Sequence, residues 1–163
     1  MPSEARFTFE RLTLPLKSEL YRGARALAGN DADALDLVQE TYLRAWKAFP
    51  SYREDQRFRA WLFTILRHAH VDLCRRKRHQ PATADPGELP EPAAPPAIGA
   101  IPDDLQAALE QLRPAHHLLL LLREVQGFSY AEIAEILGWP AGSVMSGLHH
   151  ARAALREILS KGR

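Results

Sequence analysis

Apolar residues recur every three or four positions along most of the chain, which is the spacing of one face of an α-helix. Before residue 80 this pattern predicts three helices: one that opens at Pro15 and ends at Gly29, one capped by Asn30, and one that follows a polar loop near residue 57. No alternating strand pattern competes with them, so the sequence predicts an all-α fold. The predicted buried stripes are Leu16, Leu20, Ala24 and Leu27; then Leu35, Val38, Tyr42 and Trp46; then Phe58, Trp61, Leu62, Ile65, Leu66, Ala69 and Leu73.

Further helices are predicted after residue 102. Pro102 and Pro114 each suit the start of a helix, and the helix after Pro114 is apolar on nearly every side, which predicts the centre of a C-terminal domain. Two short amphipathic helices follow, around a Gly-Trp-Pro turn, and Ser129 with Glu132 has the spacing of a capping box. This pattern predicts a helix-turn-helix whose second helix faces a DNA major groove. The outward positions of that helix are Met145, Ser146, His149 and His150, and together with Ser143 and Arg152 they are the candidate DNA contacts of this helix.

A proline-rich segment separates the two groups of helices. Seven of the 12 prolines fall between Pro81 and Pro102, in a stretch without aromatic residues. Such a segment buries too little apolar surface to offset the entropy of ordering it, so we expect an extended linker at 80–102 between small domains at 5–79 and 103–160. The linker is also acidic: residues 81–110 carry six acidic and no basic side chains, whereas residues 51–80 carry eight basic and three acidic ones.

The sequence offers no catalytic grouping. It has no phosphate-binding glycine loop and no nucleophile elbow, so we expect a binding protein without a cofactor rather than an enzyme. The single cysteine, Cys74, excludes an internal disulfide. His70 and Cys74 are spaced to share a helix face, but a third metal ligand has no evident source, so no metal site is expected. Neither a signal-peptide core nor a run of about 20 apolar residues is present, which predicts a cytoplasmic protein that is not embedded in a membrane.

The segment Tyr52–Arg59 interleaves aromatic and basic residues, and Trp61 follows it. Aromatic rings can stack on unpaired bases while arginines hold phosphates, a combination suited to single-stranded nucleic acid. The alternative is that the rings belong to the core and the arginines lie in water. The basic cluster at 75–78 favours the nucleic-acid interpretation.

On the second predicted helix, Asp36, Gln39 and Glu40 form an exposed polar patch. By periodicity alone this patch is an ordinary solvated helix face.

Three segments together resemble the extracytoplasmic-function sigma factors of the bacterial sigma-70 family. They are Asp36–Trp46, with the sequence DLVQETYLRAW; Phe58–Ile65, with FRAWLFTI; and Gly127–Ala134, with GFSYAEIA. Three motifs in the right order, divided by a linker of suitable composition, are far more specific than any one of them.

The resemblance implies sigma region two at 5–79 and sigma region four at 103–160. It implies that Asp36, Gln39 and Glu40 face the β′ clamp of core RNA polymerase, that region four meets the β flap and reads the minus-thirty-five element, and that an anti-sigma factor controls the protein. It implies no small-molecule substrate. By the same likeness, region two captures the minus-ten element through Tyr52, Arg53, Arg57, Phe58, Arg59, Trp61, Arg67, His68, Arg75, Arg76, Lys77 and Arg78.

The chain departs from the family pattern at several positions. His68 stands where relatives usually carry asparagine, and Met145, Gly147 and His150 stand where typical members carry basic residues. Each lost base contact removes about 1–3 kcal/mol of binding, so we expect weak duplex recognition by this helix. The depleted helix motivates an alternative, a sigma-like decoy that occupies an anti-sigma factor, whereas a free-standing helix-turn-helix repressor would leave the N-terminal motifs unexplained.

Overall fold

The computed structural model describes residues 2–54, 57–79 and 101–162, and over those ranges the chain forms helices and turns without strands. The all-α prediction is therefore confirmed. The predicted linker lies outside the described residues except for Ile101 and Pro102. Within the described ranges, no helix is both long enough and apolar enough to span a bilayer.

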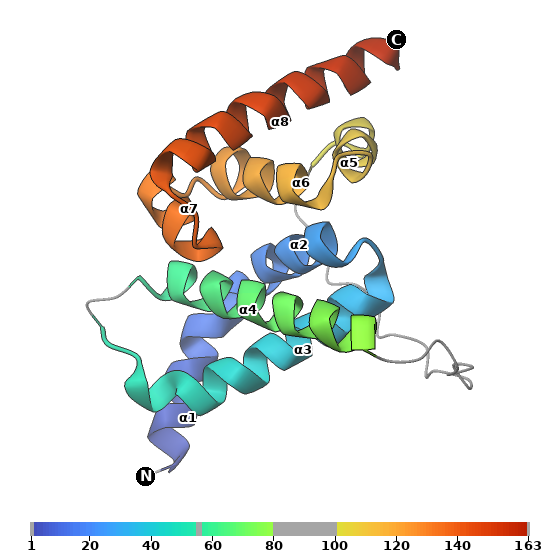
Figure 1. Cartoon of the computed structure of the whole chain (residues 1–163). Coiled ribbons are helices and arrows are strands. Elements are labelled where there is room, and N and C mark those ends of the chain that lie inside the picture. The colour runs from blue at the N-terminus through green and yellow to red at the C-terminus, as the bar shows by residue number, and fades with distance from the viewer. Residues whose placement is uncertain (1, 55–56, 80–100, 163) are drawn as a thin grey trace.

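The N-terminal unit contains four α-helices (Figure 1). Helix α1 (Pro2–Thr13) leads through a 3₁₀ turn, η1 (Leu14–Leu16), into α2 (Lys17–Ala28); α3 (Asp31–Ala48) and a second 3₁₀ turn, η2 (Phe49–Ser51), precede α4 (Phe58–His79). The sequence prediction missed α1. It placed the start of the first helix at Pro15, which in the structure lies in η1, the turn between α1 and α2.

The predicted helix boundary between α2 and α3 is confirmed. Gly29 has a φ of 84°, the left-handed conformation that glycine adopts without a steric penalty, and this residue ends α2. The side chain of Asn30 then accepts a hydrogen bond from the backbone N–H of Asp33 at 2.9 Å, which caps α3. Because these two signals are local, the sequence alone was sufficient to locate them.

The C-terminal unit follows the helix-turn-helix pattern. It consists of α5 (Asp103–Glu110), α6 (Pro114–Leu120), a π-helical turn η3 (Leu121–Val125), α7 (Tyr130–Leu137) and α8 (Ala141–Lys161). Ser129 and Glu132 form the predicted capping box, and Gly138, with a φ of 67°, makes the turn between α7 and α8. The leucines at 118–122 are buried, which confirms α6 as the centre of this unit.

The two units pack directly against each other. Helix α4 lies against α7, and α2 lies against α6 (Figure 1). Phe63 of α4 and Phe128, just before α7, are both about 1% exposed, and their ring centroids lie 5.4 Å apart in an edge-to-face contact. The buried apolar residues of both units therefore form one continuous cluster. The sequence predicted two units but not this contact.

Trp46 corrects the predicted stripe of α3. Its side chain is 41% exposed rather than buried, and its ring meets Phe9 of α1 edge-on at 5.2 Å. The sequence prediction had no α1 to place beside Trp46, so helical periodicity alone assigned this residue to the core.

Candidate polymerase and promoter interfaces

The polar patch on α3 divides into a free part and a paired part. Asp36 and Gln39 are exposed. Glu40 is half-buried and accepts a hydrogen bond from Arg44 at 3.0 Å, and Arg44 also reaches Asp72 of α4 at 2.7 Å. The bond from Arg44 holds the pKa of the Asp72 carboxyl below its ordinary value, so this carboxylate is ionised at neutral pH. Arg44 therefore ties α3 to α4 through Asp72 while Glu40 holds its guanidinium, and Asp36 and Gln39 remain available to a partner.

Leu43 extends the same face and was missed by the sequence analysis. Its side chain is 57% exposed, and it lies four residues after Gln39 and three before the partly exposed Trp46. Residues at these spacings share one side of a helix. An exposed leucine and tryptophan beside polar groups are typical of a protein-binding surface. The signal was present in the sequence, as an apolar residue outside the buried stripe.

The aromatic residues of the 52–61 segment pack on one another. The ring centroids of Tyr52 and Phe58 lie 5.3 Å apart, and those of Tyr52 and Trp61 lie 5.1 Å apart. Phe58 is buried, so its ring contributes to the core, whereas Tyr52 and Trp61 are half-buried. The structure thus combines the two alternatives: one ring is a core residue, and two keep part of their surface accessible.

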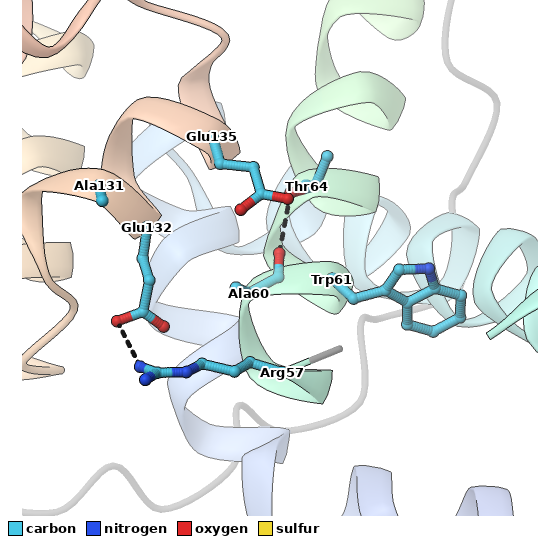
Figure 2. A pocket seen from close by; sticks show the side chains of 7 residues that line it. All are labelled: Arg57, Ala60, Trp61, Thr64, Ala131, Glu132 and Glu135. Atoms are coloured by element: carbon cyan, nitrogen blue, oxygen red, sulfur yellow. Dashed lines mark hydrogen bonds and ion pairs between the residues drawn. The ribbon is translucent and has the colours of Figure 1, made fainter. Parts of the chain in front are cut away.

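Three of the predicted DNA-binding arginines of α4 and the loop before it contact the C-terminal unit. Arg57 forms an ion pair with Glu132 of α7 at 3.0 Å (Figure 2). Arg59 bonds to Glu19 at 3.1 Å and donates to the backbone carbonyl of Gln126 at 2.8 Å.

Arg59 and Arg67 also pack closely against residues that frame α7. The guanidinium carbon of Arg59 lies 4.3 Å from the centroid of the Phe128 ring. The guanidinium of Arg67 lies so near Gly138 that a Cβ atom there would be 3.2 Å from its Nη1. We call Arg57, Arg59 and Arg67 the arginine face of the N-terminal unit.

Glu132 makes two interactions, one within the C-terminal unit and one with the arginine face. It accepts the N–H of Ser129 in the capping box, and it pairs with Arg57. Burial alone would raise its pKa, but the hydrogen bonds from Ser129 and the pairing with Arg57 bring the pKa below the ordinary value. Glu132 is therefore a carboxylate at neutral pH, next to the arginine face.

The remaining predicted minus-ten residues are exposed. They comprise Arg53 in the loop and His68, Arg75, Arg76, Lys77 and Arg78 on α4. Lys77 pairs with Asp33 at 3.2 Å across the α3–α4 contact. The Sγ atom of Cys74 and the Nε2 atom of His70 lie 3.5 Å apart, but the described residues contain no group of three potential metal ligands.

The predicted recognition helix corresponds to α8. Its outward residues Ser143, Met145, Ser146, His149 and His150 are all exposed. Arg152 is paired within the unit, with Glu124 at 2.6 Å, so it holds α8 against η3.

Gly147 departs from the sequence interpretation. Typical members of the resembled family carry a basic residue at this position, but Gly147 is half-buried, and a Cβ atom there would lie 2.9 Å from Leu119 and 3.5 Å from Trp139. Gly147 therefore permits close packing of α8 on α6 and is not a lost DNA contact.

Family models and relatives agree with this architecture. Residues 14–80 match the model of Sigma-70 region 2, and residues 103–155 match that of Sigma-70, region 4. The ECF RNA polymerase sigma factor SigL of Mycobacterium tuberculosis is 39% identical over 147 residues, covering 87% of the chain and 83% of that protein. The chain belongs to the extracytoplasmic-function (ECF) sigma factors. Accordingly, we use region two for the N-terminal unit and region four for the C-terminal unit.

Other sigma factors are also similar to this ECF chain. The RNA polymerase sigma factor YlaC of Bacillus subtilis is 33% identical over 139 residues, covering 80% of the chain and 79% of that protein. The ECF RNA polymerase sigma factor SigE of Mycolicibacterium smegmatis is 34% identical over 161 residues, which cover 94% of the chain but 62% of the length of that relative.

Two solved sigma factors have a similar fold. One is RpoE from Bartonella quintana in complex with the anti-sigma factor NepR, with a TM-score of 0.77 and 30% identity over 96% of the chain and 99% of that protein. The other is CnrH in complex with the cytosolic domain of CnrY, with a TM-score of 0.68 and 25% identity over 99% of the chain and 96% of that protein. Because both matches cover nearly the whole chain, the similarity includes both units.

Proposed function

We propose that this ECF sigma factor is a bacterial transcription initiation factor that binds core RNA polymerase and directs it to specific promoters. The observation that carries the proposal is the match of both units, in order, to sigma regions two and four, with a 39% identical ECF relative over most of the chain. Sigma factors are initiation factors, so the activity is one of binding and not of catalysis.

We assign polymerase binding to α3. Asp36 and Gln39 supply exposed polar groups, and the 57% exposed Leu43 supplies an apolar contact on the same face. Such a combination suits an interface in which a few apolar anchors are surrounded by polar contacts.

We assign minus-ten capture to the segment from Tyr52 through α4. Half-buried Tyr52 and Trp61 offer ring surface for unpaired bases, and the arginine face offers charge for phosphates. Region four would present α8 to duplex DNA through a surface that is poor in charge, which leaves most promoter affinity to region two and the polymerase.

We also propose control by an anti-sigma factor. The support is the likeness to RpoE and CnrH, each of which was solved in complex with such a partner. A decoy function, by contrast, would require anti-sigma binding without polymerase binding.

The test is binding of the full chain to purified bacterial core RNA polymerase, followed by permanganate footprinting of promoter opening. We expect Leu43→Ser to weaken core binding about tenfold or more, because truncating an interface anchor typically costs more than 1 kcal/mol. Leu14→Ser is the matched control, since Leu14 is 68% exposed but lies in η1, away from α3. Absence of core binding by the unmodified chain would overturn the proposal and favour the decoy.

A further inference from the structure

The half of α8 that we assign to duplex DNA carries no permanent charge. Between Glu135 and Arg152 the only ionisable side chains are those of His149 and His150. Both are exposed, and their ring centroids lie 5.8 Å apart. Histidine is the residue type whose charge ordinarily changes between pH 5 and 8, so the net charge of this surface depends on pH.

A third histidine, from α6, lies beside these two. Helix α8 runs along α6 (Figure 1), and His116 is half-buried near the start of α6. Burial lowers the pKa of His116, and the nearby Arg113 and His150 lower it further. The influence of His150 shows that the two rings are within electrostatic reach of each other. We call His116, His149 and His150 the histidine surface of region four.

Among the described residues, no carboxylate forms an ion pair with the histidine surface. Glu124 of η3 already pairs with an arginine of α8, and Glu132 of α7 pairs with the arginine face. Glu135 of α7 lines the pocket next to α4, and Asp104 of α5 lies by the C-terminal end of α8. Glu110 of α5 pairs with an arginine of α2. The charges that act on His116 are therefore cationic.

This arrangement couples DNA binding to proton uptake. Protonated histidines repel one another and Arg113 in the free protein, whereas the phosphates of a duplex attract them. The histidines consequently bind protons more readily in a DNA complex than in the free protein. By linkage, a group that binds protons more tightly in the complex strengthens binding as the pH falls through its titration range.

We propose that the histidine surface makes region four an acid-strengthened binder of duplex DNA: at neutral pH α8 meets the phosphates with little charge, and in mild acid its histidines and His116 supply cationic contacts. This inference rests on the proposed function, because it takes α8 to face promoter DNA. It adds a dependence on pH to that function, and it assigns a residue of α6 to the DNA-binding surface.

The experiment measures binding of the full-length protein to a fluorescein-labelled 30-base-pair duplex at pH 7.5 and pH 6.0, at constant ionic strength. We expect the affinity to rise about fivefold or more at the lower pH. The salt dependence should also steepen, by a slope of roughly 0.9 for each histidine that contacts a phosphate. Because burial lowers the pKa of His117 to about 4, the folded chain keeps this core residue neutral at both pH values.

Two variants define the limits of the response. His149→Gln with His150→Gln keeps the surface neutral, and His149→Arg with His150→Arg keeps it charged; both positions are exposed, so the core is not disturbed. We expect weak binding at both pH values for the glutamine variant and tight binding at both for the arginine variant. The unmodified protein should change from the first behaviour towards the second. An equal pH response in the unmodified protein and the glutamine variant would overturn the proposal.

Further variants test whether position matters. Ser160→His, added to the glutamine variant, places a histidine at the exposed far end of α8 and should not restore the pH response. Restoration by this variant would contradict the proposal, because any histidine on the helix would then suffice. His116→Gln alone should reduce the response, and a full response would refute the assignment of His116 to the DNA surface.

The arginine variant also separates this inference from the proposed function. If it binds the duplex no more tightly than the unmodified protein at pH 7.5, α8 does not face DNA, and both the inference and the assignment of α8 fail. If it binds more tightly while the unmodified protein is insensitive to pH, only the inference fails. RNA polymerase is absent from these measurements, so they do not depend on core binding through α3.

Discussion

At the scale of single residues, Arg59 shows how one side chain can meet different partners. A guanidinium has five N–H donors and remains charged at all ordinary pH values. In this structure Arg59 donates to the Glu19 carboxylate and the Gln126 carbonyl and lies over the Phe128 ring. The residue type determines that Arg59 binds anions and rings, while the neighbouring chain determines which of them it binds.

His117 leads to a prediction about pH. It is 4% exposed, and burial lowers its pKa to about 4, with the Glu110 carboxylate opposing and Arg25 reinforcing this shift. In the unfolded chain His117 binds a proton near pH 6.5, whereas in the folded chain it does so only near pH 4. The stability that depends on neutral His117 is therefore fully present above pH 6.5 and is lost as the pH falls from 6.5 towards 4. We expect the protonation of His117 to lower the free energy of unfolding by about 2 kcal/mol when the pH falls from 7.5 to 5.

Urea unfolding at the two pH values measures this effect. His117→Leu should reduce the pH dependence, whereas His68→Leu, at an exposed position of α4, should leave it as in the unmodified protein. An identical pH slope in both variants would show that His117 does not control acid stability. His70 adds in the same direction, since burial also lowers its pKa.

At the scale of elements, most helices were predictable because their signals are local. The capping box at Ser129, the cap at Asn30 and the prolines that precede α5 and begin α6 each act within one helical turn. Helix α1 was missed because Phe7 and Phe9 alternate with polar residues, so its apolar positions did not show a clear helical stripe. Phe7 is 67% exposed and Phe9 is buried, as expected for two residues on different faces.

The charge-poor surface of α8 leads to a second prediction. Met145 is 57% exposed and His150 is exposed, so arginine fits at both positions without disturbing the core. Met145→Arg with His150→Arg should tighten binding to duplex DNA and steepen its salt dependence, by a slope of roughly 0.9 for each new phosphate contact. Titrations of a 30-base-pair duplex at several salt concentrations would measure this slope.

A control distinguishes the recognition surface from a general gain of charge. Ser160→Arg adds a positive charge at the exposed C-terminal end of α8, roughly 22 Å along the helix from Met145. If Ser160→Arg steepens the slope as much as Met145→Arg alone, the N-terminal half of α8 is not the DNA-facing surface. Gly147 is unsuitable for this test because an added side chain would collide with Leu119.

At the scale of the whole molecule, the two sigma regions share a buried contact. Phe63 belongs to region two and Phe128 to region four, and each is almost completely buried. The stability of α7, which begins two residues after Phe128, should therefore depend on a side chain that lies far away in the sequence.

Hydrogen exchange can detect this dependence. Phe63→Leu keeps an apolar side chain but loses the edge-to-face contact, which contributes about 0.5–1.5 kcal/mol, so amide protection in α7 should fall by roughly two- to tenfold. Phe9→Leu is the matched control, because Phe9 packs on Trp46 and Phe49 within region two. Loss of α7 protection in both variants, or in neither, would contradict coupling through the Phe63–Phe128 contact.

The sequence by itself determined the all-α fold, the order of the two sigma regions, most helix boundaries and the chemistry of the arginine face. These properties follow from helical periodicity, local caps and residue type, each of which acts within a few positions of the chain. Only the tertiary structure decided that Gly147 faces Leu119, that Trp46 meets α1, and that Arg57, Arg59 and Arg67 lie against region four. The physical reason is that these contacts join segments distant in sequence, and their geometry depends on how whole helices pack together.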